Sequence, residues 1–423
     1  MSDLTWLDSV GFFTIDLGLD RMRELAALLE DPQDHLKFIH VAGSNGKGSV
    51  CTFIENGLRA AGYKTGFYSS PHLVRLEERF RISGKTVDDA SFASAAEKVR
   101  LAADKMRKEQ RAPTYFELTT ALALVIFRDL NVDFAVWETG LGGRLDATNI
   151  VTPVISIITG ISLEHTEYLG STPAAVAGEK AGIIKPGIPV VCGPVSPEAD
   201  AVIRAKAEEL HAPFYPVQAY SGEYEILFQP DGRAVQRLSL NGTTVEIPLP
   251  GSYQRNNASV AACALHILSG KYGFRETESI RGMRNAEWPA RMQFIPERKL
   301  IIDGAHNPEG AEALARSLRE FYPGKRFHFI TGCFADKNAD EILAFFAPLA
   351  LDFHFIEFDG SGRKVRTPAE LTAILRKQGF GIPAGKAGLD ESLSALPSAD
   401  GELTVLSGSL HMCGEALHFL DLL

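Results

Sequence analysis

The chain has 423 residues, of which 45% are hydrophobic and 23% are charged, and its formal net charge is −10. These fractions are typical of a globular protein and exclude a disordered chain, while the length suits two domains better than one core. The negative charge argues against a basic face for nucleic acid, and no apolar run approaches the roughly 20 residues of a membrane span.

The first half of the chain alternates short apolar runs with helical patterns. A buried strand is predicted at Phe38–Ala42, and apolar residues recur at helical spacing from Val50 to Ala61. Further strands are predicted at residues 65–69, 133–138, 153–161 and 188–192, and a helix at residues 118–130. This alternation predicts an α/β fold with a mostly parallel sheet that is covered on both faces.

A different pattern appears between residues 214 and 250. Short alternating runs at residues 224–228, 235–240 and 244–249 are separated by Pro-Asp-Gly and Asn-Gly turns. These turn pairs predict antiparallel hairpins, which we place as a small addition to the first domain. A helix is predicted to follow at residues 252–269.

The segment at residues 286–298 combines Trp288, two prolines and several charges, and we interpret it as a linker. Alternation then restarts. Strands are predicted at residues 299–303, 326–331, 352–358 and 403–407, and helices at residues 308–321, 339–350 and 367–378. We therefore expect a first domain over residues 1–285 and a smaller Rossmann-like domain over residues 299–423.

Residues 43–49 read Gly-Ser-Asn-Gly-Lys-Gly-Ser and lie between a predicted strand and a predicted helix. Glycines let backbone N–H groups converge on phosphate oxygens, the helix N-terminus adds positive potential, and Lys47 brings a full charge. Only two residues separate Gly43 from the Gly46-Lys47 pair, so the spacing is not the usual GxxxxGK[ST]. A glycine turn without a ligand is the alternative, but the order of strand, loop, lysine and helix predicts phosphate binding.

Other classes of phosphate-loop protein fit the chain less well. A GTPase would normally carry an N-K-x-D motif, which the sequence lacks. A kinase of the phosphate-loop kind would suit one small domain better than two nucleotide-fold halves.

Oxygen-bearing side chains follow several of the predicted strands. Glu138 ends an apolar strand, as a magnesium-binding acid of a phosphate-loop enzyme does, and a glycine-rich segment follows it. Ser70 follows the strand at residues 65–69 and is placed to bring a hydroxyl near the phosphates. Alone, such an acid is as often a helix cap, and a lone histidine such as His165 is usually a loop or core residue.

Eight segments together resemble the folylpolyglutamate synthase/dihydrofolate synthase family, which belongs with the muramyl peptide ligases. They occur in the order of that family and cover nearly the whole chain. These segments are residues 15–21, 43–49, 69–73, 114–117, 138–149, 179–182, 288–291 and 303–308. Two small departures are Ser44, where the family commonly has threonine, and Thr139, where valine is common.

The resemblance implies roles for the matching positions. The nucleotide-binding set is Asn45, Gly46, Lys47, Gly48, Ser49, Asn257, Arg291 and Asp303; the ligands of Mg²⁺ are Ser70, Glu138 and His165; and the catalytic set is Lys47, Lys180, Asp303 and His306. Lys180 matches a lysine that family members carry as a carbamate, an anion able to support a second Mg²⁺. The expected cofactors are therefore two Mg²⁺ ions, with a monovalent cation, and ATP is a co-substrate.

Three segments match the part of bifunctional bacterial members that binds dihydropteroate. Their residues are Asp16, Leu17, Gly18, Thr114, Tyr115, Phe116, Glu117, Leu145, Asp146 and Ala147. The expected function is ATP-dependent addition of L-glutamate to dihydropteroate, to the γ-carboxylate of tetrahydrofolate, or to both. The reaction would pass through an acyl phosphate and release ADP and phosphate.

Two rival functions are a ligase acting on a muramyl substrate and a nucleotide-binding regulator that has lost catalysis. Muramyl ligases usually add an N-terminal uridine-nucleotide domain, for which we expect no room in the segment before Gly43. A decayed enzyme would not be expected to keep all five of the residues Lys47, Glu138, His165, Lys180 and Asp303. Five scattered cysteines without CxxC spacing suit reduced thiols. We expect a monomeric, cytoplasmic enzyme with small-molecule substrates and neither nucleic acid nor membrane partners.

Overall fold

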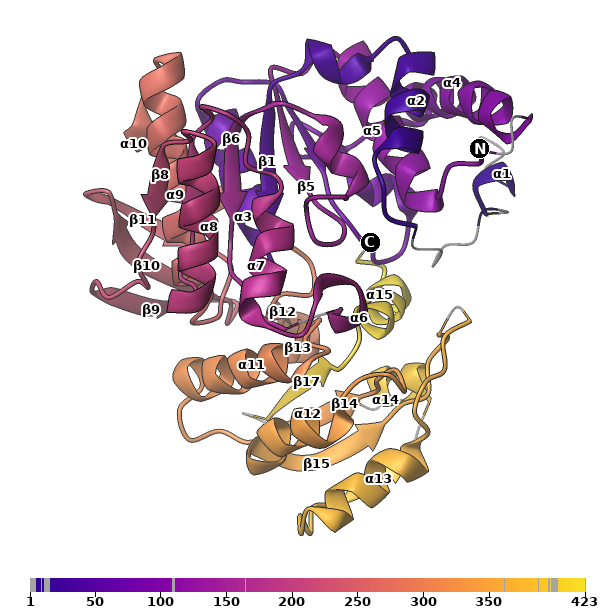
Figure 1. Ribbon diagram of the computed structural model, residues 1–423. Coiled ribbons are helices and arrows are strands. Elements are labelled where there is room, and N and C mark those ends of the chain that lie inside the picture. The colour runs from indigo at the N-terminus through magenta and orange to yellow at the C-terminus, as the bar shows by residue number, and fades with distance from the viewer. Residues whose placement is uncertain are drawn as a thin grey trace. The chain divides into compact units, whose positions relative to one another are not determined.

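The computed structural model describes residues 5–8, 10, 16–108, 111–163, 165–360, 362–386, 388–394, 396 and 402–422. The chain divides into two compact units. Unit 1 comprises Met1–Ser221, Ser239–Val245 and Asn256–Asn285, and unit 2 comprises Gly222–Leu238, Glu246–Arg255 and Ala286–Leu423. Each unit is built on its own sheet (Figure 1).

Unit 1 is built on an eight-stranded sheet in the order β4-β3-β2-β5-β1-β6-β7-β8. Strands β2 to β8 in this order are parallel to one another, and β3 and β4 add an antiparallel edge. The strands are β1 (Phe38–Ala42), β2 (Thr65–Tyr68), β3 (Phe80–Ile82), β4 (Lys85–Thr86), β5 (Phe134–Glu138), β6 (Pro153–Ile158), β7 (Val190–Cys192) and β8 (Phe214–Pro216). Every residue of β1 and β5 is buried, as expected for central strands that are covered on both faces.

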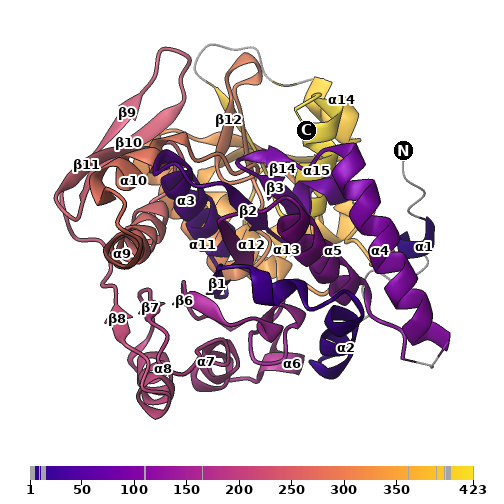
Figure 2. The same cartoon turned by 90° about the horizontal axis from the view of Figure 1, so that it is seen from above.

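The α-helices of unit 1 are α1 (Thr5–Asp8), α2 (Asp20–Leu28), α3 (Lys47–Ala60), α4 (Asp89–Lys108), α5 (Tyr115–Asp129), α6 (Thr166–Leu169), α7 (Pro173–Ala181), α8 (Pro197–Glu209), α9 (Gln254–Tyr272) and α10 (Glu276–Gly282). Short 3₁₀ turns are η1 (Pro32–His35), η2 (Leu76–Arg79), η3 (Ala147–Ile150) and η4 (Met283–Asn285). Helix α3 leads from β1 to β2, whereas α7 leads from β6 to β7 in the opposite direction along the sheet. Since crossovers are right-handed, these helices fall on opposite faces, and Figure 2 shows β1 and β6 between α3 and α7.

A three-stranded sheet has the order β11-β10-β9, with β9 (Tyr224–Phe228), β10 (Ala234–Leu240) and β11 (Thr243–Ile247). The Pro-Asp-Gly and Asn-Gly turns connect these strands, as predicted, and β9 pairs antiparallel with β10. The sequence had assigned the hairpins to the first domain. In the structure, the division between the units passes through β10 and β11, and residues Gly222–Leu238 and Glu246–Arg255 group with unit 2.

Unit 2 is built on a six-stranded sheet in the order β12-β13-β17-β14-β15-β16, in which β12 is the antiparallel edge. Its strands are β12 (Gln293–Ile295), β13 (Leu300–Asp303), β14 (Phe327–Thr331), β15 (Ala350–Phe355), β16 (Ala384–Lys386) and β17 (Leu403–Ser407). Its helices are α11 (Pro308–Phe321), α12 (Ala339–Phe346), α13 (Pro368–Lys377), α14 (Leu389–Ser394) and α15 (Leu410–Phe419), with 3₁₀ turns η5 (Pro296–Arg298) and η6 (Ala347–Leu349). Helices α11, α12 and α13 pack side by side, and α14 packs on α15.

Two predicted features of unit 2 differ in detail. Part of the segment interpreted as a linker forms β12 and η5, because Gln293–Ile295 can pair with β13 across the turn at Lys299. The helix predicted at residues 339–350 ends at Phe346, since Pro348 opens a 3₁₀ turn and Ala350 already begins β15. The predicted α/β class, with a mostly parallel sheet and a second, smaller α/β sheet, is confirmed.

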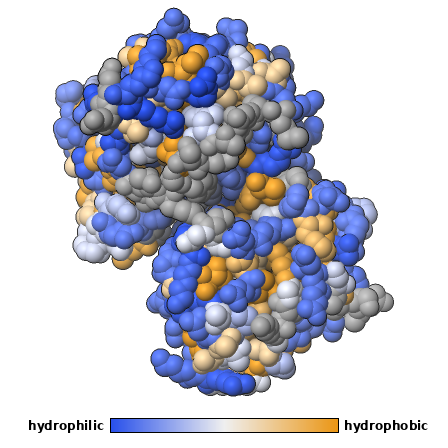
Figure 3. Space-filling view, turned by 90° about the vertical axis from the view of Figure 1, so that its right-hand side faces the viewer, coloured by the Kyte–Doolittle hydropathy of each residue, from blue (hydrophilic) through white to orange (hydrophobic). Residues whose placement is uncertain are grey.

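The surface is mainly polar on the face shown in Figure 3, where hydrophobic residues form separate groups among hydrophilic ones. Within the described parts of the chain, none of the helices combines the length and the apolar character that crossing a membrane requires.

Candidate functional site

The carboxyl ends of four neighbouring parallel strands meet at one edge of the sheet in unit 1. The pairings Val41↔Glu138, Tyr68↔Trp137 and Ala42↔Ile158 bring the ends of β1, β2, β5 and β6 level with one another. The loop at residues 43–49 leaves β1 at this edge, between the ends of β5 and β6. Ligands of open α/β sheets bind at such carboxyl edges, where connections diverge to opposite faces.

The loop at residues 43–49 is the turn from β1 into α3, as predicted. Gly46 precedes α3 with a φ of 85°, a left-handed conformation that glycine adopts at little cost. The Lys47 ammonium folds back over the loop and donates to the carbonyl oxygens of Gly43 (2.8 Å) and Ser44 (3.3 Å). If a phosphate bound in the loop, the Lys47 ammonium would pair with the phosphate instead, because an anion is a stronger hydrogen-bond acceptor than a carbonyl oxygen.

The loop after β6 holds the phosphate loop in place. The Ser44 hydroxyl donates to the Ser162 carbonyl and accepts from the Ser162 N–H, both at 3.0 Å. The Thr159 hydroxyl donates to the Asn45 carbonyl at 2.6 Å. A Cβ at Gly43 would lie 1.9 Å from Thr159 Oγ1, so only glycine permits this approach. These contacts fix the loop conformation before a ligand binds.

Asn257 lies against the same loop. It is buried on α9, and a Cβ at Gly46 would lie 2.5 Å from its Oδ1 atom. The structure therefore places Asn257, predicted as a nucleotide contact, beside Gly46 and Lys47.

Of the predicted metal ligands, the structure brings Ser70 and Glu138 together. Glu138 is 4% exposed, and its Oε2 atom accepts from the Ser70 N–H at 3.4 Å. His165 is exposed and lies at the N-cap of α6 with a φ of 46°. Among the described residues, no group of three or more His, Cys, Asp or Glu side chains is arranged to hold a metal ion. A carboxylate and a hydroxyl are nevertheless the oxygen donors that suit Mg²⁺, which keeps several waters and takes further oxygens from phosphates.

The pKa of the Cys51 thiol is affected by two charged residues of the candidate site. Its thiol is fully buried on α3; burial raises its pKa well above the usual value, Glu138 raises it further, and Lys47 lowers it. The Glu138 carboxylate and the Lys47 ammonium therefore both act on one point at the base of α3.

The glycine-rich segment after Glu138 docks on the end of α7, which carries Lys180. The Arg144 N–H donates to the Glu179 carbonyl at 2.8 Å, and the two side chains form an ion pair at 2.9 Å. A Cβ at Gly143 would lie 3.0 Å from the Lys180 carbonyl oxygen. Lys180 itself is 1% exposed. The predicted catalytic lysine is thus a buried residue on a helix that is fixed to the segment following Glu138.

Two of the predicted substrate segments meet through Arg21. Thr114 is the N-cap of α5, and its capping box with Glu117 explains why both residue types occur at this spacing. Glu117 Oε2 accepts from the Arg21 Nε atom at 3.2 Å, and Arg21 also pairs with the exposed Asp16 at 2.7 Å. Burial lowers the pKa of Arg21, but Glu117 and Asp16 outweigh this effect and raise it. Ile15, the first residue of the motif, lies outside the described residues.

The third substrate segment adjoins the second. A Cβ at Gly140 would lie 2.5 Å from Phe116 Cζ, so the Phe116 ring packs directly on the glycine-rich segment. Asp146 is 3% exposed, and its carboxylate accepts from the N–H groups of Leu141 (2.7 Å) and Thr148 (3.0 Å). Burial raises the pKa of Asp146, and these hydrogen bonds oppose the shift. The Asp146 side chain, which lies between Leu145 and Ala147 in the sequence, therefore stabilises the conformation of the loop to which it belongs.

In unit 2, Asp303 ends β13 and is 4% exposed. Its carboxylate accepts from the N–H groups of Met292 (2.8 Å) and Ala305 (2.9 Å) and from the Tyr253 hydroxyl (3.4 Å). Burial raises the pKa of Asp303, while Arg291 acts in the opposite direction. A Cβ at Gly304 would lie 2.7 Å from Arg291 Nη1, so the structure places Asp303 and Arg291 close together.

His306 follows at the start of α11. Its Nδ1 atom lies 2.8 Å from the Gly304 carbonyl oxygen. Because a carbonyl only accepts, Nδ1 carries the hydrogen, and in the neutral ring Nε2 is then free of a proton.

Sequence reasoning missed three residues of this site. Arg21 joins two of the predicted substrate segments, and Thr159 and Ser162 hold the loop at residues 43–49. Each of the three contacts a partner about 100 residues away in the chain. No local spacing identifies such partners. Arg21 did lie within a family motif, which was the available signal.

Comparison with known proteins agrees with this geometry. Residues 41–265 match the Mur ligase middle domain, and residues 290–409 match the Mur ligase glutamate ligase domain. The dihydrofolate synthase/folylpolyglutamate synthase of Bacillus subtilis is 33% identical over 84% of this chain and 84% of its own length. The protein of the same name from Escherichia coli is 33% identical over 99% of this chain and 94% of its own length.

A solved structure described as E. coli FolC in complex with DHPP and ADP superposes with a TM-score of 0.82 at 29% identity. The superposition covers 99% of this chain and 96% of that one. Both domains and most of the length of these relatives are thus shared. The chain belongs to the folylpolyglutamate synthase/dihydrofolate synthase family of the Mur ligase superfamily, whose members are ATP-dependent ligases.

Proposed function

We propose that this protein uses ATP to add L-glutamate to dihydropteroate and to the γ-carboxylate of tetrahydrofolate. The observation that carries the proposal is the edge of the unit 1 sheet, where the phosphate loop with Lys47 lies beside the buried Glu138 carboxylate and Ser70. This arrangement supports transfer of a phosphoryl group, and the family supports an amide-forming ligase.

The chemistry follows from the poor reactivity of a carboxylate toward amines at neutral pH. A carboxylate oxygen of the acceptor attacks the γ-phosphorus of ATP, ADP leaves, and an acyl phosphate forms. The amine of L-glutamate then attacks the acyl carbon, and phosphate leaves as the amide forms and the amine gives up a proton. Lys47 stabilises the charge on the transferred group, in a site that the loop contacts have organised in advance.

Ser70 and Glu138 fit a magnesium ion because they offer oxygen donors at the edge where the phosphates would lie. His165 is the third proposed ligand. When bound, Mg²⁺ would screen the phosphate charge during transfer. We include in the proposal a carbamate on the buried Lys180, which the intact mass of the protein, with and without acid treatment, would reveal.

The substrate segments support a pterin-bearing acceptor. Glu117 Oε1 is buried without a hydrogen-bond partner among the described residues, although its other oxygen is fully engaged. A buried acceptor of this kind is costly unless a donor reaches it. Pterin rings carry N–H donors, and the Phe116 ring nearby offers an aromatic face. We therefore assign residues 16–18, 114–117 and 145–147 to the acceptor.

We propose a catalytic role for His306, whose Nε2 atom is able to accept a proton. If it does essential acid–base work, the pH–rate profile of His306→Ala loses one limb. An unchanged profile would rule out that role.

The decisive experiment measures ADP release with Mg-ATP and L-glutamate, comparing dihydropteroate with tetrahydrofolate as the acceptor. Turnover with both supports the full proposal, and turnover with one restricts it to that acceptor. Absence of turnover with either acceptor would contradict it. Lys47→Ala should abolish turnover while leaving the circular dichroism spectrum unchanged, because Lys47 contacts only its own loop in the contacts described above.

A further inference from the structure

Asn149 joins the glycine-rich segment that follows Glu138 to the end of α7, and all of these residues belong to unit 1. Asn149 is 5% exposed, and its Nδ2 atom donates to the Arg144 carbonyl and to the Gly182 carbonyl, both at 3.0 Å. Arg144 belongs to the glycine-rich segment, whereas Gly182 is the C-cap of α7 and lies 33 residues beyond Asn149. One side chain therefore bonds to two backbone stretches that are distant in the chain.

Lys185 holds the oxygen end of the same side chain. Its ammonium donates to Asn149 Oδ1 at 2.8 Å and to the Asn149 backbone carbonyl at 3.3 Å. These partners also identify the two amide atoms, because the reverse orientation would turn the Nδ2 hydrogens toward an ammonium and Oδ1 toward two carbonyl oxygens. Burial, with a smaller effect of Arg23, lowers the pKa of Lys185, so keeping an ammonium in this place costs free energy. The amide of Asn149 is thus fixed at both its nitrogen and its oxygen.

The two backbone stretches approach each other at glycines. A Cβ at Gly182 would lie 2.4 Å from Arg144 Cα, and a Cβ at Gly143 would lie 3.0 Å from the Lys180 carbonyl oxygen. Glycine permits this approach, but it has no side chain with which to maintain it. The hydrogen bonds of Asn149 supply that connection, and one of them satisfies a carbonyl at a helix end, where no partner within the helix is available.

We propose that Asn149, held by Lys185, is a positioning residue that fixes Lys180 beside the glycine-rich segment. Lys180 is buried and precedes Gly182 by two residues, within the same turn, so fixing the Gly182 carbonyl fixes the place from which the Lys180 side chain starts. Asn149 acts on Lys180 through this backbone turn. The inference rests on the proposed function, because it requires Lys180 to take part in the reaction.

The carbamate proposed for Lys180 gives its position a direct readout. The neutral Nζ atom attacks the carbon of CO₂, a C–N bond forms, and the nitrogen releases a proton to solvent, which leaves a carboxylate on Nζ. The reaction is reversible, so the carbamate fraction at a given bicarbonate concentration measures how well the surroundings of Nζ fit the product.

The test measures this fraction by ¹³C NMR after equilibration with ¹³C-bicarbonate, and Lys180→Ala identifies the resonance. Asn149→Ala should lower the fraction several-fold and lower kcat about tenfold, with the KM for ATP changed much less. Raised bicarbonate should restore both the resonance and kcat, because mass action replaces the lost carbamate. Lys185→Met, a second variant that serves if Asn149→Ala folds poorly, should act in the same direction.

Thr172→Ala is the matched control on the same helix. Thr172 caps the other end of α7, where its Oγ1 atom accepts from the Ala175 N–H at 3.2 Å. Its removal loosens α7 without touching the end that carries Lys180. The carbamate fraction and kcat should therefore stay within about twofold of the wild-type values.

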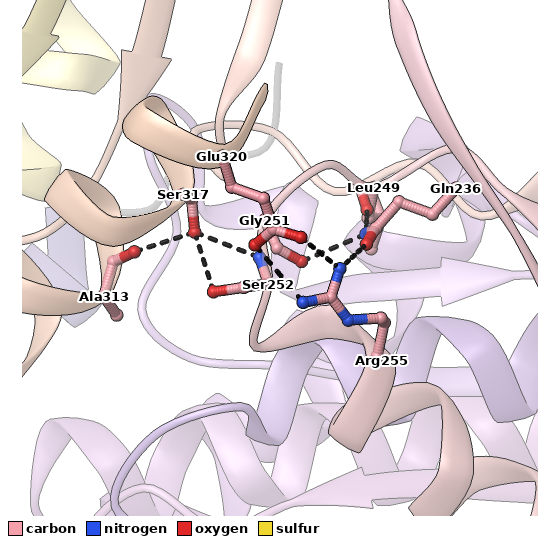
Figure 4. Close-up of polar contacts among 8 residues, drawn as sticks. All are labelled: Gln236, Leu249, Gly251, Ser252, Arg255, Ala313, Ser317 and Glu320. Atoms are coloured by element: carbon pink, nitrogen blue, oxygen red, sulfur yellow. Dashed lines mark hydrogen bonds and ion pairs between the residues drawn. The ribbon is translucent and has the colours of Figure 1, made fainter. Parts of the chain in front are cut away.

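Ser317→Ala controls for the loss of a buried hydrogen-bonded side chain in unit 2. Ser317 Oγ accepts from the Ser252 N–H at 3.0 Å and donates to the Ala313 carbonyl at 2.7 Å, as Figure 4 shows. This variant should lose stability in chemical unfolding but keep the carbamate fraction of the wild-type protein.

A carbamate fraction in Asn149→Ala equal to that in Thr172→Ala would overturn the inference. A kcat that stayed low after bicarbonate had restored the carbamate would also overturn it, since the defect would then lie elsewhere than at Lys180. A wild-type protein without the Lys180 resonance would do the same, while ADP release with the two acceptors would still decide the ligase function separately. Absence of ADP release with either acceptor would contradict the proposed function, and the inference with it.

Discussion

At the scale of single residues, His40 shows how a buried titratable group connects through Thr148 to Asp146, a residue of the proposed acceptor site. It lies on β1, and its Nε2 atom is 3.0 Å from Thr148 Oγ1. The Thr148 hydroxyl donates to Asp146, so it accepts from His40, and Nε2 carries the ring hydrogen. Nδ1 is buried without a hydrogen-bond partner in the described structure. Burial, with a smaller effect of Lys185, lowers the pKa of His40 to about 3.

This shift predicts a pH-dependent stability. In the unfolded chain His40 takes a proton near pH 6.5, whereas the folded protein excludes that proton until about pH 3. The stabilisation is therefore complete above pH 6.5 and is lost as the pH falls, at a rate of up to about 1.4 kcal/mol per pH unit. Urea unfolding between pH 7 and pH 5 should show a shallower loss in His40→Gln, which keeps an amide donor. Parallel slopes in both proteins would contradict the assignment.

The sequence predicted candidate residues for the site, but it did not predict the partners that the structure gives them. Lys47, Glu138 and Lys180 stand in motifs, and the structure places the first two at one edge of the sheet. Arg21 lies within a motif, but its partner Glu117 is 96 residues away, and no local spacing identifies such a pair. The sequence also did not show that the Asp146 carboxylate is engaged by its own loop.

At the scale of elements, two helices begin with the same capping box, and only one of them belongs to the proposed acceptor site. Thr114 with Glu117 caps α5, and Thr367 with Glu370 caps α13 in unit 2. Removing either threonine should cost about 1 kcal/mol, because an N-cap hydroxyl satisfies a backbone N–H that would otherwise lack a partner. Chemical unfolding of Thr114→Ala and Thr367→Ala checks this equality.

The two variants should differ in catalysis. Thr114→Ala frees the start of α5 and moves Glu117, so the KM for the pterin acceptor should rise several-fold while the KM for ATP changes little. Thr367→Ala should alter neither constant. The same rise in both variants would show that Thr114 acts on stability alone and not on the acceptor site.

The elements themselves were predictable where the pattern was periodic. The helix at residues 308–321 and the strand at residues 224–228 match the structure at both ends, since proline and turn residues mark them. The short strands β3, β4 and β12 were not predicted, because two- or three-residue antiparallel edges have no periodicity to detect. Strand order was equally hidden, since β17 enters the sheet of unit 2 between β13 and β14, which precede it in the chain.

At the scale of the whole molecule, binding and stability are linked. A ligand that binds only the folded state stabilises it by about 2.7 kcal/mol at a hundredfold excess over its dissociation constant. Mg-ADP should therefore raise the unfolding temperature of the wild-type protein by several degrees in differential scanning calorimetry. Lys47→Ala should show a much smaller rise at the same ADP concentration. A shift of equal size in both would mean that ADP binds elsewhere.

The place of β1 in its sheet has a consequence for synthesis on the ribosome. Both neighbours of β1, β5 and β6, are made after it, and β6 is complete only at Ile158. The residues that hold the phosphate loop, Thr159 and Ser162, emerge later still, and Asn257 follows almost 100 residues afterwards. The loop at residues 43–49 is therefore made early in translation. The residues that contact it are complete only after more than half of the chain has been made, so ATP can bind and stabilise the fold only from that point. Until β5 and β6 have been made, the apolar strand β1 stays unpaired, which makes it a natural place for a chaperone to bind during synthesis.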